Sequence, residues 1–170
     1  MRWTSMPPVN SLSQAERWLK NRVLGPDVFN FAVETRSSGE YIGIMGCFHP
    51  PSIGYITSPA HTDRGYTTEA LKALVPALFE RLPPAGASGT GFDYLEGTTD
   101  PDNWASRRVL EKAGFRQCEM QENAIEHWLS GLRGTVVYRL ARPSKTLEEL
   151  GLIEDAIDDV VDPSAVPPIQ

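Results

Sequence analysis

A glycine-centred loop followed by an amphipathic run is the pattern in this sequence best suited to chemistry. Gly65 follows a short β-branched and aromatic run, residues 53–57, and Pro59 ends that predicted strand. From Thr68 onward the apolar residues have the spacing of one helix face, at Leu71, Leu74, Val75, Leu78 and Leu82. The start of such a helix leaves backbone N–H groups unpaired and carries about half a positive charge, so it can bind a diphosphate. An ordinary turn with Thr67 or Thr68 as the helix cap fits the same residues.

The elements before this loop are predicted to be one helix and two strands. Ser13 and Glu16 have the spacing of a capping box, which predicts a helix over 13–24. Residues 29–34 and 41–48 are predicted to form the two strands of a hairpin. The chain up to residue 57 therefore favours an antiparallel meander.

The elements after the loop continue this alternation. Pro76 should kink or end the long helix, because proline lacks a backbone N–H. A second helix is predicted to start at Asp102 or Asn103 and to end at Gly114. Further strands are predicted over residues 92–98, 115–122 and 135–142. The order predicts an α+β fold, with a mixed, mostly antiparallel sheet of about six strands flanked by helices.

Composition and charge restrict the class of protein. The formal charge of −6 equals that of residues 144–170, which hold one lysine and seven acidic residues, so residues 1–143 are neutral. Such a body has no basic surplus for nucleic acid. We expect one domain over 1–143 and a solvated acidic tail over 144–170, helical from Leu147 to about Val161.

Location and cofactors follow from what the sequence lacks. No stretch has the length of a membrane span, and the first residues do not resemble a signal peptide. Cys47 and Cys118 lie far apart, without the spacing of metal ligands, and are expected to be reduced thiols. We therefore expect a cytoplasmic protein that binds neither membrane nor metal.

Two stretches in this order carry a family resemblance. RGYTTEAL, after GYITSPAH, resembles the acyl-CoA-binding motif of the GNAT N-acetyltransferase superfamily. DPDNWASRRVLEKAGF resembles the second motif of its ribosomal-protein-alanine N-acetyltransferase subgroup. The resemblance spans about Ser13 to Arg142 and implies transfer of an acetyl group from acetyl-CoA to a primary amine. The acceptor is then a protein N-terminus or a small amine.

The resemblance also implies which residues hold acetyl-CoA. Backbone amides of the loop bind the pyrophosphate, at Thr62, Asp63, Arg64, Gly65, Tyr66, Thr67 and Thr68. Thr62 and Thr67 depart from the family pattern Arg/Gln-x-x-Gly-x-Gly/Ala, and Arg64 either pairs with a phosphate or is solvated. The strand that contains Ile56 and Thr57 pairs with the pantetheine arm, and one of its amides polarises the thioester carbonyl.

Catalytic roles are implied in the same way. Ser106, on one helix face with Val109, Leu110 and Ala113, protonates the departing thiolate. Asn103 contacts the cofactor arm, caps the helix, or does both.

A base must also take a proton from the amine. Glu96 is the first candidate, with His49 and Asp93 as alternatives. His61 is predicted to be a loop residue, and His127 either shapes an acceptor pocket or lies in a surface loop beside Trp128.

One departure from the family concerns the start of the chain. Family members usually carry a strand and a helix before the helix predicted here over 13–24, and only about a dozen residues precede it. The strand at 29–34 is then an edge, which we expect the Trp3 region, the acidic tail or a second subunit in a homodimer to cover. This departure leaves open an alternative function, a catalytically weak CoA-binding or interaction protein on the same scaffold.

Overall fold

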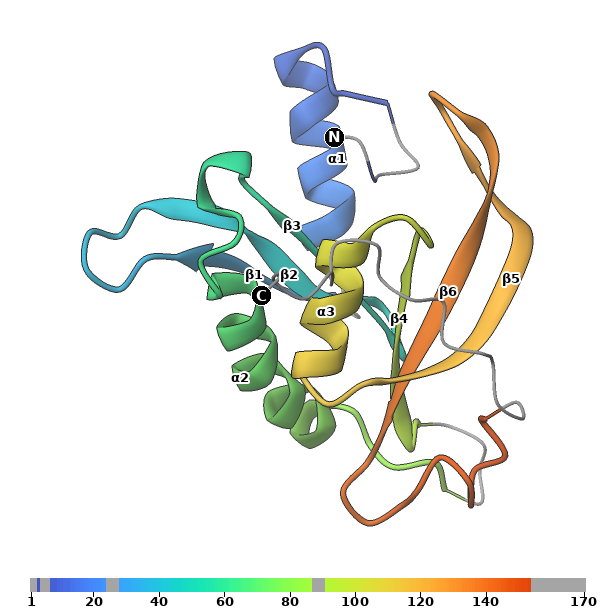
Figure 1. The fold of residues 1–170 in the computed structure, drawn as a ribbon. Helices are drawn as coiled ribbons and strands as arrows, with labels where there is room; N and C mark the ends of the chain where they lie inside the picture. The colour runs from blue at the N-terminus through green and yellow to red at the C-terminus, as the bar shows by residue number, and fades with distance from the viewer. Residues whose placement is uncertain (1–2, 4–6, 24–27, 87–90, 154–170) are drawn as a thin grey trace, which may run out of the picture.

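The computed structural model describes residues 3, 7–23, 28–86 and 91–153. These residues form three α-helices, one short 3₁₀ helix and a six-stranded sheet (Figure 1). The helices are α1 (Leu12–Val23), α2 (Tyr66–Arg81) and α3 (Trp104–Lys112), with η1 (Pro59–His61) before α2. The strands are β1 (Phe29–Glu34), β2 (Tyr41–His49), β3 (Ser52–Thr57), β4 (Tyr94–Thr99), β5 (Arg116–His127) and β6 (Gly131–Ala141). The predicted α+β class and order of elements are confirmed.

The sheet has the order β1-β2-β3-β4-β6-β5, and its neighbours are antiparallel except β3 and β4. This parallel pair is short, because it contains only Ser52 opposite Glu96 and Ile53 opposite Gly97. Beyond these two positions the strands separate. The sheet therefore opens between β3 and β4.

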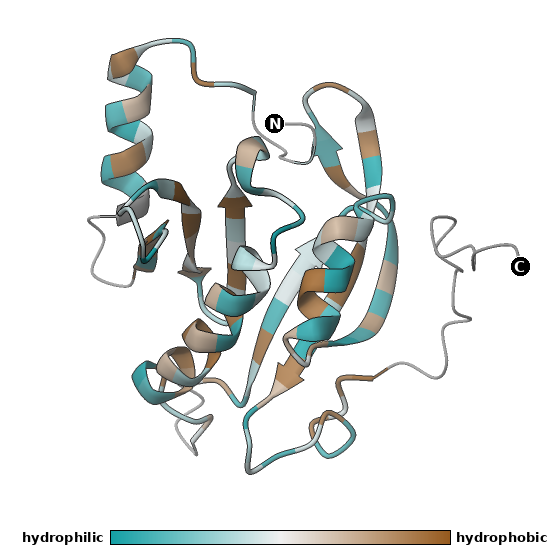
Figure 2. Ribbon diagram, turned by 60° about the vertical axis from the view of Figure 1, so that its left-hand side comes forward, coloured by the Kyte–Doolittle hydropathy of each residue, from teal (hydrophilic) through white to brown (hydrophobic). Residues whose placement is uncertain are grey.

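Helices α2 and α3 cover one face of this sheet (Figure 1). Their apolar residues alternate with polar ones along the helix, which is the pattern of a half-buried helix (Figure 2). Gly97 allows close contact with α3, because a Cβ there would lie 2.8 Å from Leu110 Cδ2. The shared core contains Met45, Cys47, Ile53, Leu71, Leu74, Leu78, Leu95, Leu110, Phe115, Val136 and Tyr138.

Three details of the helices correct the sequence analysis. Helix α1 is capped by Ser11 rather than Ser13, because Ser11 Oγ accepts from the N–H of Gln14. Helix α2 begins at Tyr66, with Gly65 as its cap, so neither threonine caps it. It also runs through Pro76 to Arg81. Burial of Leu74, Leu78 and Phe79 around the proline holds the helix together despite one missing hydrogen bond.

The β5–β6 hairpin is longer than predicted. Its register shifts between Gln121 and Ile125, and Asn123 has a φ of 51°. Such a bulge redirects the strand beyond it. Because the residues at the bulge are polar, the outer half of β5 was not predicted as a strand. His127 therefore ends a strand and is buried, rather than exposed in a loop.

The described part of the acidic tail packs on the domain. Leu147 is buried, and the backbone carbonyl of Leu152 accepts from Arg139 Nη1 at 3.1 Å. Residues 147–151 form turns, so the helix predicted from Leu147 is wrong there, and its continuation beyond residue 153 lies outside the described residues. The cause is packing against β6, which overrides helix propensity.

Strand β1 forms one edge of the sheet, and Phe31 on it is half exposed. Trp3 lines a cavity on the neighbouring strands, and the described tail lies against β6. The rest of both segments lies outside the described residues, so cover of β1 by the Trp3 region, by the acidic tail or by a second subunit stays a prediction. None of the described helices is both long enough and apolar enough to span a bilayer.

Candidate active site

The opening between β3 and β4 is the centre of the candidate site. From Gly54 onward, β3 pairs with β2 on one side and has no ladder partner among the described residues on the other. Ile56 and Thr57 lie on this stretch. Backbone groups along an unpaired edge can bind an extended ligand as an added strand.

The loop before α2 has the backbone geometry that its sequence suggests. Gly65 has a φ of 81°, and Asp63 has a φ of 60°. A Cβ on Gly65 would meet no heavy atom within 4 Å, so the glycine is needed for its conformation and open space lies beside it. The first N–H groups of α2, on Tyr66, Thr67 and Thr68, have no partner within the helix. These residues therefore fit a phosphate group.

Thr67, which departs from the family pattern, is bound to the sheet. Its hydroxyl lies 2.8 Å from that of Thr57 on β3. The threonine thus joins the start of α2 to the free edge of β3 instead of capping the helix. Thr62 donates to the carbonyl of Pro59, and Arg64 is exposed.

Ser106 lies at the sheet-facing side of α3, as predicted. Asn103 is the helix cap, because its Oδ1 accepts from the N–H of Ser106 at 3.2 Å. The hydroxyl of Ser106 lies 2.8 Å from that of Tyr55 on β3, and the Tyr55 hydroxyl also donates to the Ser106 carbonyl. Burial raises the pKa of Tyr55 to about 12, so its hydroxyl remains protonated at neutral pH. No local signal in the sequence links Tyr55 to Ser106, because the two residues lie 51 positions apart.

The candidate bases lie in different places. Glu96 accepts from Arg139 Nε at 2.8 Å, and both side chains are largely buried. Asp93, at the start of β4, accepts from the N–H of Ala85 and lies 3.7 Å from Arg142. The structure therefore places both carboxylates in structural contacts.

The two histidines named with them lie elsewhere. His49 is exposed at the end of β2. His61 belongs to η1 and contacts Glu40 at 3.2 Å. Neither is among the residues that line the cavity beside the opening.

That cavity, of about 420 Å³, borders both sides of the opening. Its apolar wall includes Trp3, Val9, Trp18, Phe48, Ile53 and Ile125, while Tyr55, Asp100, His127 and Arg133 are its ionisable residues. These side chains come from the N-terminal segment, α1, three inner strands and the β5–β6 hairpin. A largely apolar cavity of this size with a few polar groups is typical of a small-ligand site.

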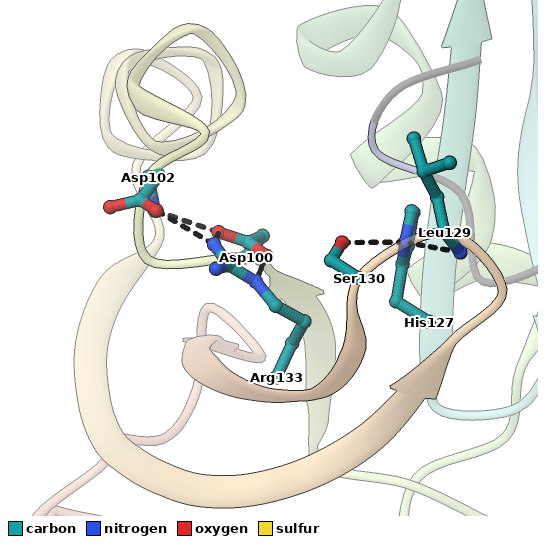
Figure 3. Close-up of polar contacts among 6 residues, drawn as sticks. All are labelled: Asp100, Asp102, His127, Leu129, Ser130 and Arg133. Carbon is teal, nitrogen blue, oxygen red and sulfur yellow. Dashed lines mark hydrogen bonds and ion pairs between the residues drawn. The ribbon is translucent and has the colours of Figure 1, made fainter.

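At the polar end of the cavity, Arg133 contacts the carboxylates of Asp100 and Asp102 (Figure 3). Arg133 Nε and Nη2 each lie 2.8 Å from an oxygen of Asp100, and Nη2 also contacts Asp102 at 2.6 Å. Burial by itself would raise the pKa of Asp100, but the hydrogen bonds from Arg133 and from the Asp102 N–H outweigh it. The pKa of Asp100 is therefore below its ordinary value of 3.8.

His127, for which the sequence left both an acceptor pocket and a surface loop open, ends β5 and lines this cavity. Its side chain is 8% exposed, and Nδ1 accepts from the N–H of Leu129 at 3.3 Å, with the Ser130 hydroxyl at 3.0 Å (Figure 3). Because a backbone N–H can only donate, the neutral ring carries its proton on Nε2. That Nε2 is buried and has no hydrogen-bond partner among the described residues.

A sheet that opens between two parallel strands, with a glycine loop and a helix start beside the opening, is the arrangement that the resemblance to the GNAT superfamily implies. Residues 1–116 match the acetyltransferase (GNAT) domain family, and the chain belongs to this family.

Three known proteins illustrate the relationship. A relative described as probable N-acetyltransferase YjcK, from Bacillus subtilis strain 168, is 30% identical over 105 residues, which is 58% of this chain. The chain spans about half of that relative, 54% of its length. A GNAT-family acetyltransferase from Bacillus anthracis has a TM-score of 0.65 at 19% identity, over 83% of this chain and 80% of the other. RimL, a ribosomal L7/L12 alpha-N-protein acetyltransferase solved in complex with coenzyme A, has a TM-score of 0.64 at 16% identity, over 81% and 76%.

Proposed function

We propose that this protein transfers an acetyl group from acetyl-CoA to a primary amine, by direct attack of the amine on the thioester while both are bound. The observation that carries this proposal is the free edge of β3 opposite β4, with the Ser106 hydroxyl on the helix side and a cavity on the other side. Family membership supports the same activity. One substrate can then lie along β3 while the other reaches it from the cavity.

In this proposal the chain holds the acyl donor at two places. The N–H groups at the start of α2 and the loop around Gly65 bind the diphosphate, because a helix N-terminus favours negative charge. Backbone groups at Ile56 and Thr57 bind the pantetheine arm and polarise the thioester carbonyl. The crystallised complex of RimL with coenzyme A supports a site of this kind on the fold.

The attacking nitrogen must lose two protons. The ammonium first loses one proton to water, and the free amine then forms a bond to the acyl carbon as the carbon–sulfur bond breaks. Ser106 gives its proton to the departing thiolate and takes one from the Tyr55 hydroxyl, which is 2.8 Å away and protonated at neutral pH. The second proton of the attacking nitrogen then returns to Tyr55 through water, so the side chains end as they began. The products are the N-acetylated amine, coenzyme A and one proton released to water.

The base remains a prediction. Glu96 was predicted from the sequence, but its carboxylate is bound by Arg139 and does not line the cavity. An amine with a pKa near 8 needs only a carboxylate or water to lose its proton. We therefore assign the proton to water in the cavity and test Glu96 by substitution.

Release of free thiol from acetyl-CoA, measured with a panel of primary amines, tests the proposed function. We expect amine-dependent thiol release with at least one acceptor and equal amounts of N-acetylated product. Binding of CoA without turnover by any amine would instead favour the catalytically weak CoA-binding protein.

A further inference from the structure

We propose that Asp100 binds the ammonium group of the acceptor, and that the acceptor is a primary amine on a compact apolar body with an oxygen near the amine. This inference rests on the proposed function and names the acceptor side of the same site. It assigns an acceptor-binding role to Asp100, the first residue of the second motif, and to His127, which lies outside both motifs.

The position of Asp100 supports this role. It directly follows β4, and alternation along the strand puts it on the same face as Glu96 and Thr98, opposite the face packed on α3. The β3–β4 pairing ends at Gly97, so Asp100 lies beside the opening. Glu96 lies four residues back, about 13 Å along the strand at ~3.3 Å per residue. Of these two carboxylates, Asp100 is the one that lines the cavity.

The charge of Asp100 and its unused hydrogen-bond acceptor position also support this binding role. Of the two carboxylates that contact Arg133, only that of Asp100 lines the cavity, where its negative charge favours a cation. Asp100 Oδ1 accepts from Arg133 and from the Asp102 N–H, whereas Oδ2 accepts from Arg133 alone. Oδ2 therefore keeps one acceptor position for an ammonium N–H. Because its pKa is lowered, the Asp100 carboxylate stays ionised. It can therefore bind the ammonium of the acceptor without taking a proton from it.

His127 gives the independent second observation. It lines the same cavity, is more than nine-tenths buried, and its Nε2 has no partner among the described residues. A buried donor without a partner is costly, so an oxygen on the acceptor would satisfy it. The apolar wall, formed by Trp18, Phe48 and Ile125 among others, fits the body of such an amine.

Kinetics with phenylalaninamide as the acceptor test the proposal. Asp100→Asn keeps the shape of the side chain and removes its charge, so KM for the amine should rise roughly 10- to 100-fold while kcat changes only a few-fold. Asp102→Asn is the matched control, since Asp102 contacts the same guanidinium but is 68% exposed and does not line the cavity, and its KM should stay within about 2-fold. Equal KM values for Asp100→Asn and the parent would overturn the proposal.

A binding measurement on the parent protein keeps the test valid if Asp100→Asn does not fold. Trp3 and Trp18 line the cavity, so bound acceptors should change the tryptophan fluorescence. Phenylalaninamide should bind at least tenfold more tightly than 3-phenylpropanamide, its neutral analogue, and than spermidine, which lacks an apolar body. Equal affinity for the neutral analogue would overturn the ammonium site, and tighter binding of spermidine would overturn the apolar body.

Two further comparisons test the His127 contact and distinguish a free amine from a protein N-terminus. Phenethylamine, which lacks the oxygen, should bind several-fold more weakly than phenylalaninamide in the parent but equally in His127→Ala, and equal binding in the parent would overturn the His127 contact. A peptide that begins with phenylalanine tests whether a protein N-terminus is accepted besides a free amine. Calorimetry with acetyl-CoA should give the same affinity for Asp100→Asn and the parent. Failure of the parent to bind acetyl-CoA would remove the proposed function, while the amine titration still decides the ammonium site.

Discussion

The two sides of the β3–β4 opening are built differently. On the helix side, the functional residues belong to three short stretches, which are 62–68 and 103–106, each at the start of a helix, and 55–57 on β3. On the cavity side, Trp18, Phe48, Asp100, His127 and Arg133 come from five separate elements or their ends. The helix side depends on backbone geometry, which local sequence determines. The cavity side depends on side chains that only the folded chain brings together.

If this comparison is correct, removing a hydroxyl should lower kcat strongly on the helix side and only slightly on the cavity side. Ser106→Ala on the helix side removes the proton donor to the thiolate, so kcat should fall about 10²- to 10⁴-fold with the KM for the amine little changed. Ser130→Ala on the cavity side removes only a contact to His127 Nδ1, so kcat should stay within a few-fold. Steady-state kinetics of both variants give the answer. A Ser106→Ala enzyme with the parent's kcat would exclude Ser106 from proton transfer.

A pair of glycines tests whether the helix side depends on backbone conformation. Gly65 and Gly39 both have positive φ, 81° and 67°, and a Cβ on either meets nothing within 4 Å. Alanine at each should therefore cost a similar stability, about 1 kcal/mol. Gly65→Ala should also lower the affinity for acetyl-CoA roughly tenfold, since the loop no longer holds its geometry. Thermal unfolding and calorimetry measure the two effects, and equal acetyl-CoA affinities would show that the loop is not the diphosphate site.

Tyr55→Phe sharpens the account of Ser106. The variant keeps the ring in the core and removes the hydroxyl that restores the serine proton. We expect kcat to fall about tenfold, less than for Ser106→Ala, because water can replace the phenol more easily than it can replace Ser106. A loss as large as that of Ser106→Ala would make Tyr55 the acid itself.

Glu96→Gln tests the base predicted from the sequence. Because Arg139 holds the Glu96 carboxylate in a largely buried pair, we expect kcat to stay within a few-fold and the protein to lose stability, which thermal unfolding measures. A kcat lowered 100-fold or more, with normal acetyl-CoA binding, would restore Glu96 as the base.

The smallest expected effect concerns pH. The folded-state pKa of Asp100 is lowered, so its contribution to stability is fully present above the ordinary value of 3.8 and is lost as pH falls through the folded value. Asp100→Asn should therefore make the free energy of unfolding less dependent on pH below about 4. Urea unfolding at several pH values measures this slope, and an unchanged slope would mean that Arg133 does not stabilise the carboxylate.

Much of the fold could be predicted from the sequence, because its signals are local. Asn103 is the cap of α3, and Gly114 has the positive φ of 94° expected after a helix. Gly65 likewise has the conformation that a glycine before a helix suggests. The outer half of β5 was missed because its residues are polar and its register shifts at a bulge. Leu147 was assigned to a helix, although it is buried in a stretch of turns that binds to β6 through Leu152.

The candidate site divides in the same way. The loop at Gly65 and the position of Ser106 follow from spacing within a few residues. The contact of Tyr55 with Ser106 and that of Asp100 with Arg133 join residues 51 and 33 positions apart. Contacts at such separations depend on sheet order and register, which a single sequence does not specify. On the acceptor side, only His127 was named from the sequence, as one of two alternatives, whereas Asp100 and Arg133 were not.

Titration calorimetry of the folded protein with acetyl-CoA tests the central claim most directly. The account predicts saturable binding of one acetyl-CoA per chain, weakened by Gly65→Ala and unaffected by Asp100→Asn. Absence of any binding heat, with the protein shown to be folded, would contradict it.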